Sequence, residues 1–134
     1  MGLILDTCVL IYAETNDNAL NFDKWASFEE VFISVITVSE LLMGVQRANT
    51  EARKLKRSAF VEAIIREIPI IDFTPEVARI HAAIYGSLAE RGQLIGAHDL
   101  MIAATAIAHG HALLTGNQGE FMRVPGLTVL EFAK

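Results

Sequence analysis

Short apolar runs alternate with longer amphipathic stretches along the chain, and this alternation predicts strands that alternate with helices. The apolar runs expected to form strands are residues 3–6, 31–35, 69–71 and 112–115, with a weaker run at 127–130. These runs lack a regular polar alternation, which is typical of parallel strands covered on both faces. The pattern therefore predicts an α/β fold, a three-layer sandwich in which helices flank a parallel central sheet.

The stretches between these runs carry apolar residues at helical spacing. The expected helices cover residues 7–12, 19–28, 37–46, 50–67, 74–90 and 99–108, with a loop at 15–18. Thr74 gives the clearest helix start, because this capping hydroxyl precedes a proline and an acid in the first turn. The long helix is expected to turn one apolar stripe towards the core, made of Leu55, Ala59, Ala63 and Ile64.

The length of 134 residues suits one domain, so residues 1–134 are expected to form a single domain. No apolar stretch reaches the roughly 18 residues that a membrane-spanning helix needs, so no membrane association is expected. Asp6 interrupts the amino-terminal apolar run early, which argues against a secretion signal. Cys8 is the only cysteine and cannot form an internal disulfide, which favours a reducing cytoplasm.

Three acids lie where a buried strand ends or a helix begins, namely Asp6, Glu40 and Asp99. No lysine or arginine lies within three residues of any of them. Each acid alone has an ordinary explanation, as a turn former, a residue of an early helical turn or a helix cap. If all three converge, however, their burial needs a cation, and Mg²⁺ or Mn²⁺ prefers such oxygen ligands. The combination predicts a metal-dependent enzyme that cleaves phosphodiester bonds.

Several segments resemble the PIN domain family, and within it the VapC toxins of bacterial toxin–antitoxin modules. The matching segments are Leu5-Asp6-Thr7 and residues 33–41, 96–106, 115–121 and 124–127. They follow one another in the family's order and spacing over essentially the whole chain. The resemblance implies a parallel sheet with flanking helices, a Mg²⁺- or Mn²⁺-dependent endoribonuclease, and inhibition by a cognate VapB-type antitoxin.

The resemblance also implies roles for individual positions. The family's metal-binding acids correspond to Asp6, Glu40 and Asp99. Thr115 corresponds to a hydroxyl residue that orients the first acid. Asn117 stands where many PIN domains have a fourth acid, and Glu120 is the other candidate to complete the site. Cys8 stands where asparagine or serine often follows the Asp-Thr pair, and it is expected to pack rather than to act as a nucleophile.

Such a site would hydrolyse RNA to leave a 5′-phosphate and a 3′-hydroxyl, and the family suggests tRNA or ribosomal RNA as the target. The alternative is a catalytically inactive PIN-like scaffold that acts by binding protein or RNA, but all three acids are present. An aspartyl phosphatase would need a second aspartate at the position of Cys8. A receiver domain would need a lysine where Thr115 ends the late strand, so both phosphotransfer readings are disfavoured.

The formal net charge of −5 is unusual for a nucleic-acid binder, although a basic segment partly offsets it. The run 53–57 is expected either to contact RNA phosphates or an acidic antitoxin segment, or to be a solvated helix face. His98 is not expected to bind the same metal as Asp99, because a helix turns neighbouring side chains about 100° apart. His109 and His111 are interpreted as marking a helix end. Apolar helix faces beyond the needs of one core predict a homodimer.

Overall fold

The computed structural model describes residues 1–16, 28 and 30–132, and within them the strands form one parallel sheet. The strands are β1 (Leu3–Leu5), β2 (Val31–Ser34), β3 (Ile70–Ile71), β4 (Ala112–Thr115) and β5 (Val129–Glu131). Their order across the sheet is β3-β2-β1-β4-β5, and every neighbouring pair is parallel. The predicted parallel sheet is thus confirmed, whereas the predicted helix over 19–28 lies almost entirely outside the described residues.

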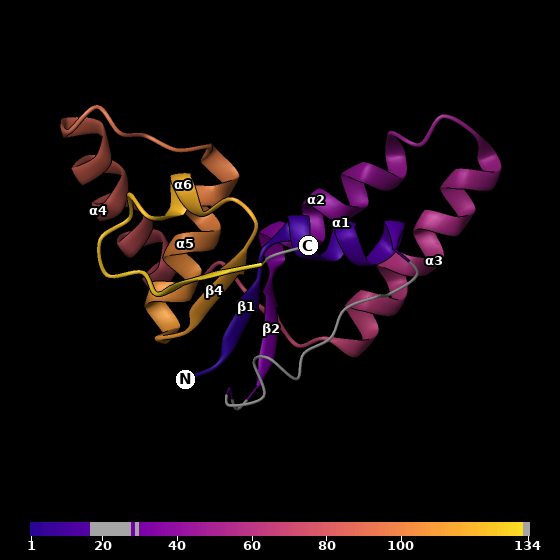
Figure 1. The fold of residues 1–134 in the computed structure, drawn as a ribbon, viewed down its shortest axis with the longest axis horizontal. Coiled ribbons are helices and arrows are strands. Elements are labelled where there is room, and N and C mark those ends of the chain that lie inside the picture. Colours follow the sequence, from indigo (N-terminus) through magenta and orange to yellow (C-terminus); the bar gives the residue numbers. More distant parts are fainter. Residues whose placement is uncertain (17–27, 29, 133–134) are drawn as a thin grey trace.

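Helices cover both faces of this sheet (Figure 1). They are α1 (Thr7–Thr15), α2 (Val35–Gln46), α3 (Glu51–Glu67), α4 (Pro75–Glu90), α5 (Ala97–His109) and α6 (Gln118–Phe121). In Figure 1, α1, α2 and α3 lie on one side of the strands and α4, α5 and α6 on the other, so the predicted three-layer sandwich is confirmed. In the part of the chain that is described, no helix combines the length and apolar character needed to cross a membrane.

The two faces of the sheet belong to two separate hydrophobic clusters. Ile4 and Leu113 pack with α4, α5 and α6, whereas their neighbours Leu3, Leu5 and Leu114 pack with α1, α2 and α3. Successive side chains of a strand point to opposite faces, and here both faces are covered. This explains why the strands read as continuous apolar runs.

Several predicted boundaries are confirmed by capping contacts. The Thr74 hydroxyl accepts a hydrogen bond from the Val77 backbone N–H, and α4 begins at Pro75 as expected. Helix α5 ends at His109, and Gly110 caps it with a φ of 66°, a conformation that favours glycine. His111 then enters β4 with its Nδ1 accepting the Gly2 backbone N–H at 3.0 Å, so this histidine ties the amino terminus to the sheet.

The predicted apolar stripe of α3 is wrong in its first half. Leu55 is 70% exposed and Ala59 is also exposed, whereas Val61, outside the predicted stripe, is 1% exposed. Only the carboxyl-terminal half of α3 packs towards the sheet, because α2 and α3 form a hairpin whose tip projects away from it (Figure 1). The sequence also gave no sign of α6, because one helical turn is too short for a periodic pattern.

The order of the strands creates a topological switch point between the neighbouring strands β1 and β4, and we call the region outside their carboxyl ends the crevice. The chain leaves β1 towards α1 on one face, whereas it reaches β4 from α5 on the other face. In open α/β sheets, ligands bind at such a switch point, outside the carboxyl ends of the strands. Asp6 directly follows β1 and Thr115 ends β4, so both residues lie at this crevice.

We expect Val61→Ala to lower the free energy of unfolding by about 1–3 kcal/mol, because it removes fully buried methyl groups. Leu55→Ala on the same helix is the matched control and should change it by less than about 0.5 kcal/mol, because this side chain lies in solvent. Urea unfolding followed by circular dichroism measures both. Equal losses would show that the first half of α3 is packed as well.

Candidate active site

Asp6 connects the end of β1 to the start of α1, and only 5% of this residue is exposed. Its Oδ1 accepts the Thr7 backbone N–H at 2.8 Å, which makes Asp6 the N-cap of α1. Its Oδ2 accepts hydrogen bonds from the Thr115 hydroxyl at 2.7 Å and from the Cys8 thiol at 3.3 Å. Burial raises the pKa of Asp6 even though these three donors lower it, and the negative charge of Glu40 adds to the increase.

Thr115 links the carboxyl ends of two neighbouring strands. Its hydroxyl donates to Asp6 and accepts the backbone N–H of Asn117 at 2.9 Å, so the direction of its single proton is fixed. The residue is fully buried. The structure therefore brings Thr115 and Asp6 into contact, whereas their roles in activity stay predictions.

Cys8 is half-buried beside the same carboxylate. Its sulfur accepts the Gly116 backbone N–H at 3.4 Å, and its thiol faces Asp6. Burial, followed by the charge of Asp6, raises the pKa of the Cys8 thiol, which keeps it protonated and a poor nucleophile. This environment agrees with the expected packing role.

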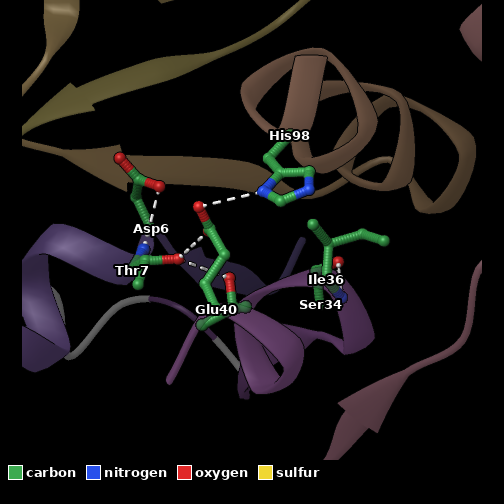
Figure 2. A network of polar contacts seen from close by, with 7 residues as sticks. Asp6, Thr7, Ser34, Ile36, Glu40 and His98 are labelled. Carbon is green, nitrogen blue, oxygen red and sulfur yellow. Dashed lines mark hydrogen bonds and ion pairs between the residues drawn. The ribbon is translucent and has the colours of Figure 1, made fainter. Parts of the chain in front are cut away.

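Glu40 reaches from α2 into the space between α1 and α5 (Figure 2). Its Oε1 accepts the Thr7 hydroxyl at 2.6 Å, and that hydroxyl also lies 3.1 Å from the hydroxyl of Thr37. Its Oε2 lies 3.3 Å from Nδ1 of His98. The Glu40 side chain is 27% exposed. The Glu40 carboxylate thus contacts one residue of α1 and one of α5, and these contacts hold it close to the crevice.

Asp99 lies in the first turn of α5, where the helix dipole favours a negative charge. It lines a hollow together with Glu40 and residues 96–98. Burial is the largest cause that raises the pKa of Asp99 to about 7, followed by the negative charge of Asp6 and by a side-chain hydrogen bond with Glu120. The charges of Glu120 and Glu40 add to this increase. The negative charges of Asp6, Glu40 and Glu120 therefore all raise the pKa of Asp99.

Glu120 and Asn117 occupy different places although both were candidates for the same role. Glu120 lies close to Asp99, because its side chain and its negative charge both raise the pKa of Asp99. The Asn117 side-chain amide donates to Oε2 of Glu120 at 2.8 Å. Asn117 thus supports Glu120 from the side, and of the two it is Glu120 that presents a carboxylate to the crevice.

The four acids Asp6, Glu40, Asp99 and Glu120 have little positive charge around them. From the described residues, no lysine or arginine forms an ion pair with any of them, and only His98 does so if protonated. The same part of the chain contains no group of three or more His, Cys, Asp or Glu side chains already arranged to hold a metal ion. The contacts explain this. The two Glu40 oxygens point to Thr7 and His98. Asp99 interacts instead with the nearby Glu120.

Sequence reasoning missed the contacts that Thr7 and His98 make with Glu40. Thr7 had a visible signal, since it begins a helix directly after Asp6 and its side chain can therefore point across the crevice. His98 was considered only as a ligand beside Asp99. The His98 side chain points away from Asp99 and towards Glu40 on α2. This contact depends on how α2 and α5 pack against each other, although they are distant in sequence.

Comparison with known proteins agrees with this architecture. The family described as PIN domain matches residues 3–127. The chain is 40% identical to Ribonuclease VapC1 of Rickettsia felis over 130 residues, which cover 97% of this chain and 96% of that protein. It is 34% identical to the tRNA(fMet)-specific endonuclease VapC of Salmonella typhimurium over 97 residues, which cover 72% of this chain and 71% of that protein.

A solved structure shows the same fold. The crystal structure of VapBC2 from Rickettsia felis, bound to a DNA fragment from their promoter, contains a chain that superposes with a TM-score of 0.88 and 28% sequence identity. The superposition covers 99% of this chain and 100% of that chain. Because sequence and fold agree over nearly the whole length, this chain belongs to the PIN domain family, in its VapC group.

Proposed function

We propose that this chain is an endoribonuclease toxin of a toxin–antitoxin system and that it hydrolyses RNA phosphodiester bonds. The observation that carries this proposal is the grouping of four carboxylates at the β1–β4 crevice of a PIN domain, without a lysine or arginine partner from the described residues. The relatives named Ribonuclease VapC1 and tRNA(fMet)-specific endonuclease VapC support it. An inactive scaffold would not need these acids, whose mutual repulsion opposes folding.

The donor set fits a Mg²⁺ or Mn²⁺ ion, because carboxylate oxygens are the ligands that these ions prefer. Burial raises the pKa values of Asp6 and Asp99, and the negative charges of neighbouring acids add to this increase, so a bound cation would stabilise the ionised carboxylates. Asp6, Glu40 and Asp99 would hold the ion, with Glu120 as the fourth carboxylate. When bound, the ion would neutralise charge on the phosphate and activate the attacking water.

The residues around the acids would hold them in place for this reaction. Thr115 fixes Asp6, and Asn117 fixes Glu120. Thr7 holds one oxygen of Glu40. In the hydrolysis, water adds to phosphorus and the bond to the 3′ oxygen breaks, so the products carry a 5′-phosphate and a 3′-hydroxyl. Among the described side chains of the crevice, none is an evident general base that could take the proton from the attacking water.

The comparisons also suggest partners. Because the superposed Rickettsia felis chain comes from a VapBC2 complex, we infer that a VapB-type antitoxin binds this chain and blocks its activity. The Salmonella typhimurium relative is named for its action on tRNA(fMet), which makes tRNA the first substrate to test. The expected homodimer stays a prediction.

We expect the purified, antitoxin-free protein to cut total cellular RNA at discrete positions with Mg²⁺ or Mn²⁺ and not with EDTA. Asp6→Asn and Asp99→Asn should each lower the rate by more than about 100-fold, since loss of outer-shell partners alone costs about 10–100-fold at metal sites. Asp72→Asn is the matched control, because this exposed aspartate also follows a strand, β3, but lies outside the crevice. Mapping the cut ends identifies the target.

Cleavage that survives in both variants would point to a contaminating nuclease. Absence of cleavage by the unmodified protein, with Mn²⁺ binding intact by calorimetry, would favour the inactive scaffold.

Glu120→Gln should weaken Mn²⁺ binding by about tenfold or more, because it removes a carboxylate charge that faces Asp99. Asn117→Asp should bind Mn²⁺ at least as well as the unmodified protein if residue 117 can reach the ion. Calorimetric titration with Mn²⁺ distinguishes the two positions. An unchanged affinity in Glu120→Gln would remove Glu120 from the proposed ligand set.

Without metal, the protein should become less stable as the pH rises from about 5 to about 8. The pKa of Asp99 is about 7 in the folded chain, above its usual unfolded value of roughly 3.9. The protonated carboxyl therefore stabilises the fold below that unfolded value, and this contribution is lost as the pH rises through about 7. Asp6 acts in the same direction.

Melting temperatures in EDTA across this pH range measure the effect. Asp99→Asn should flatten the dependence, and Mg²⁺ should restore stability to the unmodified protein at the higher pH. A dependence that is equally steep in Asp99→Asn would contradict the assignment to this carboxyl.

A further inference from the structure

A groove between α1, α2 and α3 continues from the acids towards the basic part of α3. The hollow beside Asp99 and a second hollow both have Glu40 in their walls. The second hollow and a third one share Glu14, Thr15 and Arg57. Neighbouring hollows thus share wall residues, and we call the surface that they follow the α1–α3 groove. It begins at Glu40 and ends at Arg53 and Lys56.

The charge of this groove is opposite to that of the whole protein. Its walls contain four of the 11 lysine and arginine residues of the chain, in a protein with a formal net charge of −5, namely Arg47, Arg53, Lys56 and Arg57. Among the described residues, Glu14 is the only acid besides Glu40 in the walls of these two hollows. The groove is thus a local positive path that leads to a negative site.

Most of this positive charge is available to a ligand. Arg57 is held by Glu14, with Nε 3.5 Å from Oε1, and it donates to the Gly44 carbonyl oxygen at 3.0 Å. Arg53 donates to the neutral side chain of Asn49 at 2.8 Å, and the described residues give no ion pair for it. The described residues give no ion pair for Arg47 or Lys56, and both side chains are exposed.

The arrangement of these cations opposes the stability of α3. Arg53 lies three residues before Lys56 and four residues before Arg57, so the three side chains project from one helix face. Like charges at these spacings repel one another and destabilise a helix. A solvated helix face gains nothing from this repulsion, whereas a bound polyanion would relieve it.

We propose that the α1–α3 groove binds the RNA strand on one side of the scissile phosphate. This proposal rests on the proposed ribonuclease function and adds the residues that hold the substrate. Arg47 and Arg57 contact phosphates next to the acids, and Arg53 and Lys56 contact phosphates farther along the strand. Arg47 caps the carboxyl end of α2 and follows Glu40 by seven residues, roughly 10 Å along the helix axis, which is within the reach of a few nucleotides.

An acidic polypeptide is the other ligand that these cations could attract. Its carboxylates, however, would be repelled at the inner end, because Glu40 lies in the groove wall there and Asp99 lines the adjoining hollow. An RNA substrate would use both ends of the groove. The phosphodiester to be cleaved must lie at the acids, while cations neutralise the neighbouring phosphates of the strand. The position of the groove next to the acids therefore favours RNA over an acidic polypeptide as its ligand.

The test compares two double variants that lose the same charge. Arg47→Gln/Lys56→Gln removes two exposed groove cations, whereas Arg66→Gln/Arg79→Gln removes two exposed arginines elsewhere on α3 and α4. Binding of fluorescently labelled bulk tRNA is measured by anisotropy in EDTA over a series of NaCl concentrations, so that no cleavage occurs. Melting temperatures verify that both variants fold.

The groove variant should bind tRNA about tenfold or more weakly at low salt. The slope of log K against log[NaCl] should become shallower by about 1.4, which is roughly 0.7 for each lost single-strand phosphate contact. In Mg²⁺, KM should rise while kcat stays near that of the unmodified protein, because binding is lost equally in the ground and transition states. The control variant should retain the slope and KM of the unmodified protein.

Unchanged binding in the groove variant, or an equal loss in the control variant, would overturn the proposal. Weaker capture of an oligo-glutamate peptide with unchanged tRNA binding would also overturn it, in favour of an acidic polypeptide. The two proposals fail in distinguishable ways. Unmodified protein that binds tRNA through the groove without cleaving any RNA would refute the ribonuclease function, whereas cleavage with an unaltered KM in the groove variant would refute only the groove.

Discussion

The hydrogen bond from Thr115 to Asp6 joins the ends of β1 and β4, and the other acids take their positions around it. It is buried, and it lies where the connections of the sheet diverge to opposite faces. Asp6 also starts α1, which carries Thr7 and thereby positions Glu40. The Thr115 hydroxyl accepts the Asn117 backbone N–H, and Asn117 positions Glu120. One pair of side chains thus links the sheet to two of the other acids.

The crevice gathers negative charge that the rest of the chain does little to neutralise. Neutral donors hold the carboxylates, because hydroxyl, thiol and amide groups satisfy oxygen atoms without removing their charge. Burial raises the pKa values of Asp6 and Asp99, and the charges of the neighbouring acids raise them further. A fold optimised only for stability would place arginine or lysine here, so the arrangement is better understood as preparation for a cationic ligand.

The sequence predicted those features that depend on local pattern. The buried runs around Ile4 and Leu113 predicted the parallel sheet, and a strand that ends in Asp6 predicted where the first acid would lie. The stripe of α3 was misjudged because helical periodicity defines a face but not how much of it finds a partner, as Leu55 shows. The contact between Glu40 and His98 was invisible because it joins α2 to α5, 58 residues apart in sequence.

The α2–α3 hairpin projects from the sheet, and only its base contributes to the hydrophobic core (Figure 1). Substitutions at its exposed positions have little effect on folding, since surface changes usually alter stability by less than about 0.5 kcal/mol. The acids, in contrast, are fixed by the buried junction of β1 and β4. The architecture therefore separates the acids, which a buried junction holds in place, from a peripheral surface whose exposed side chains can be exchanged without disturbing that junction.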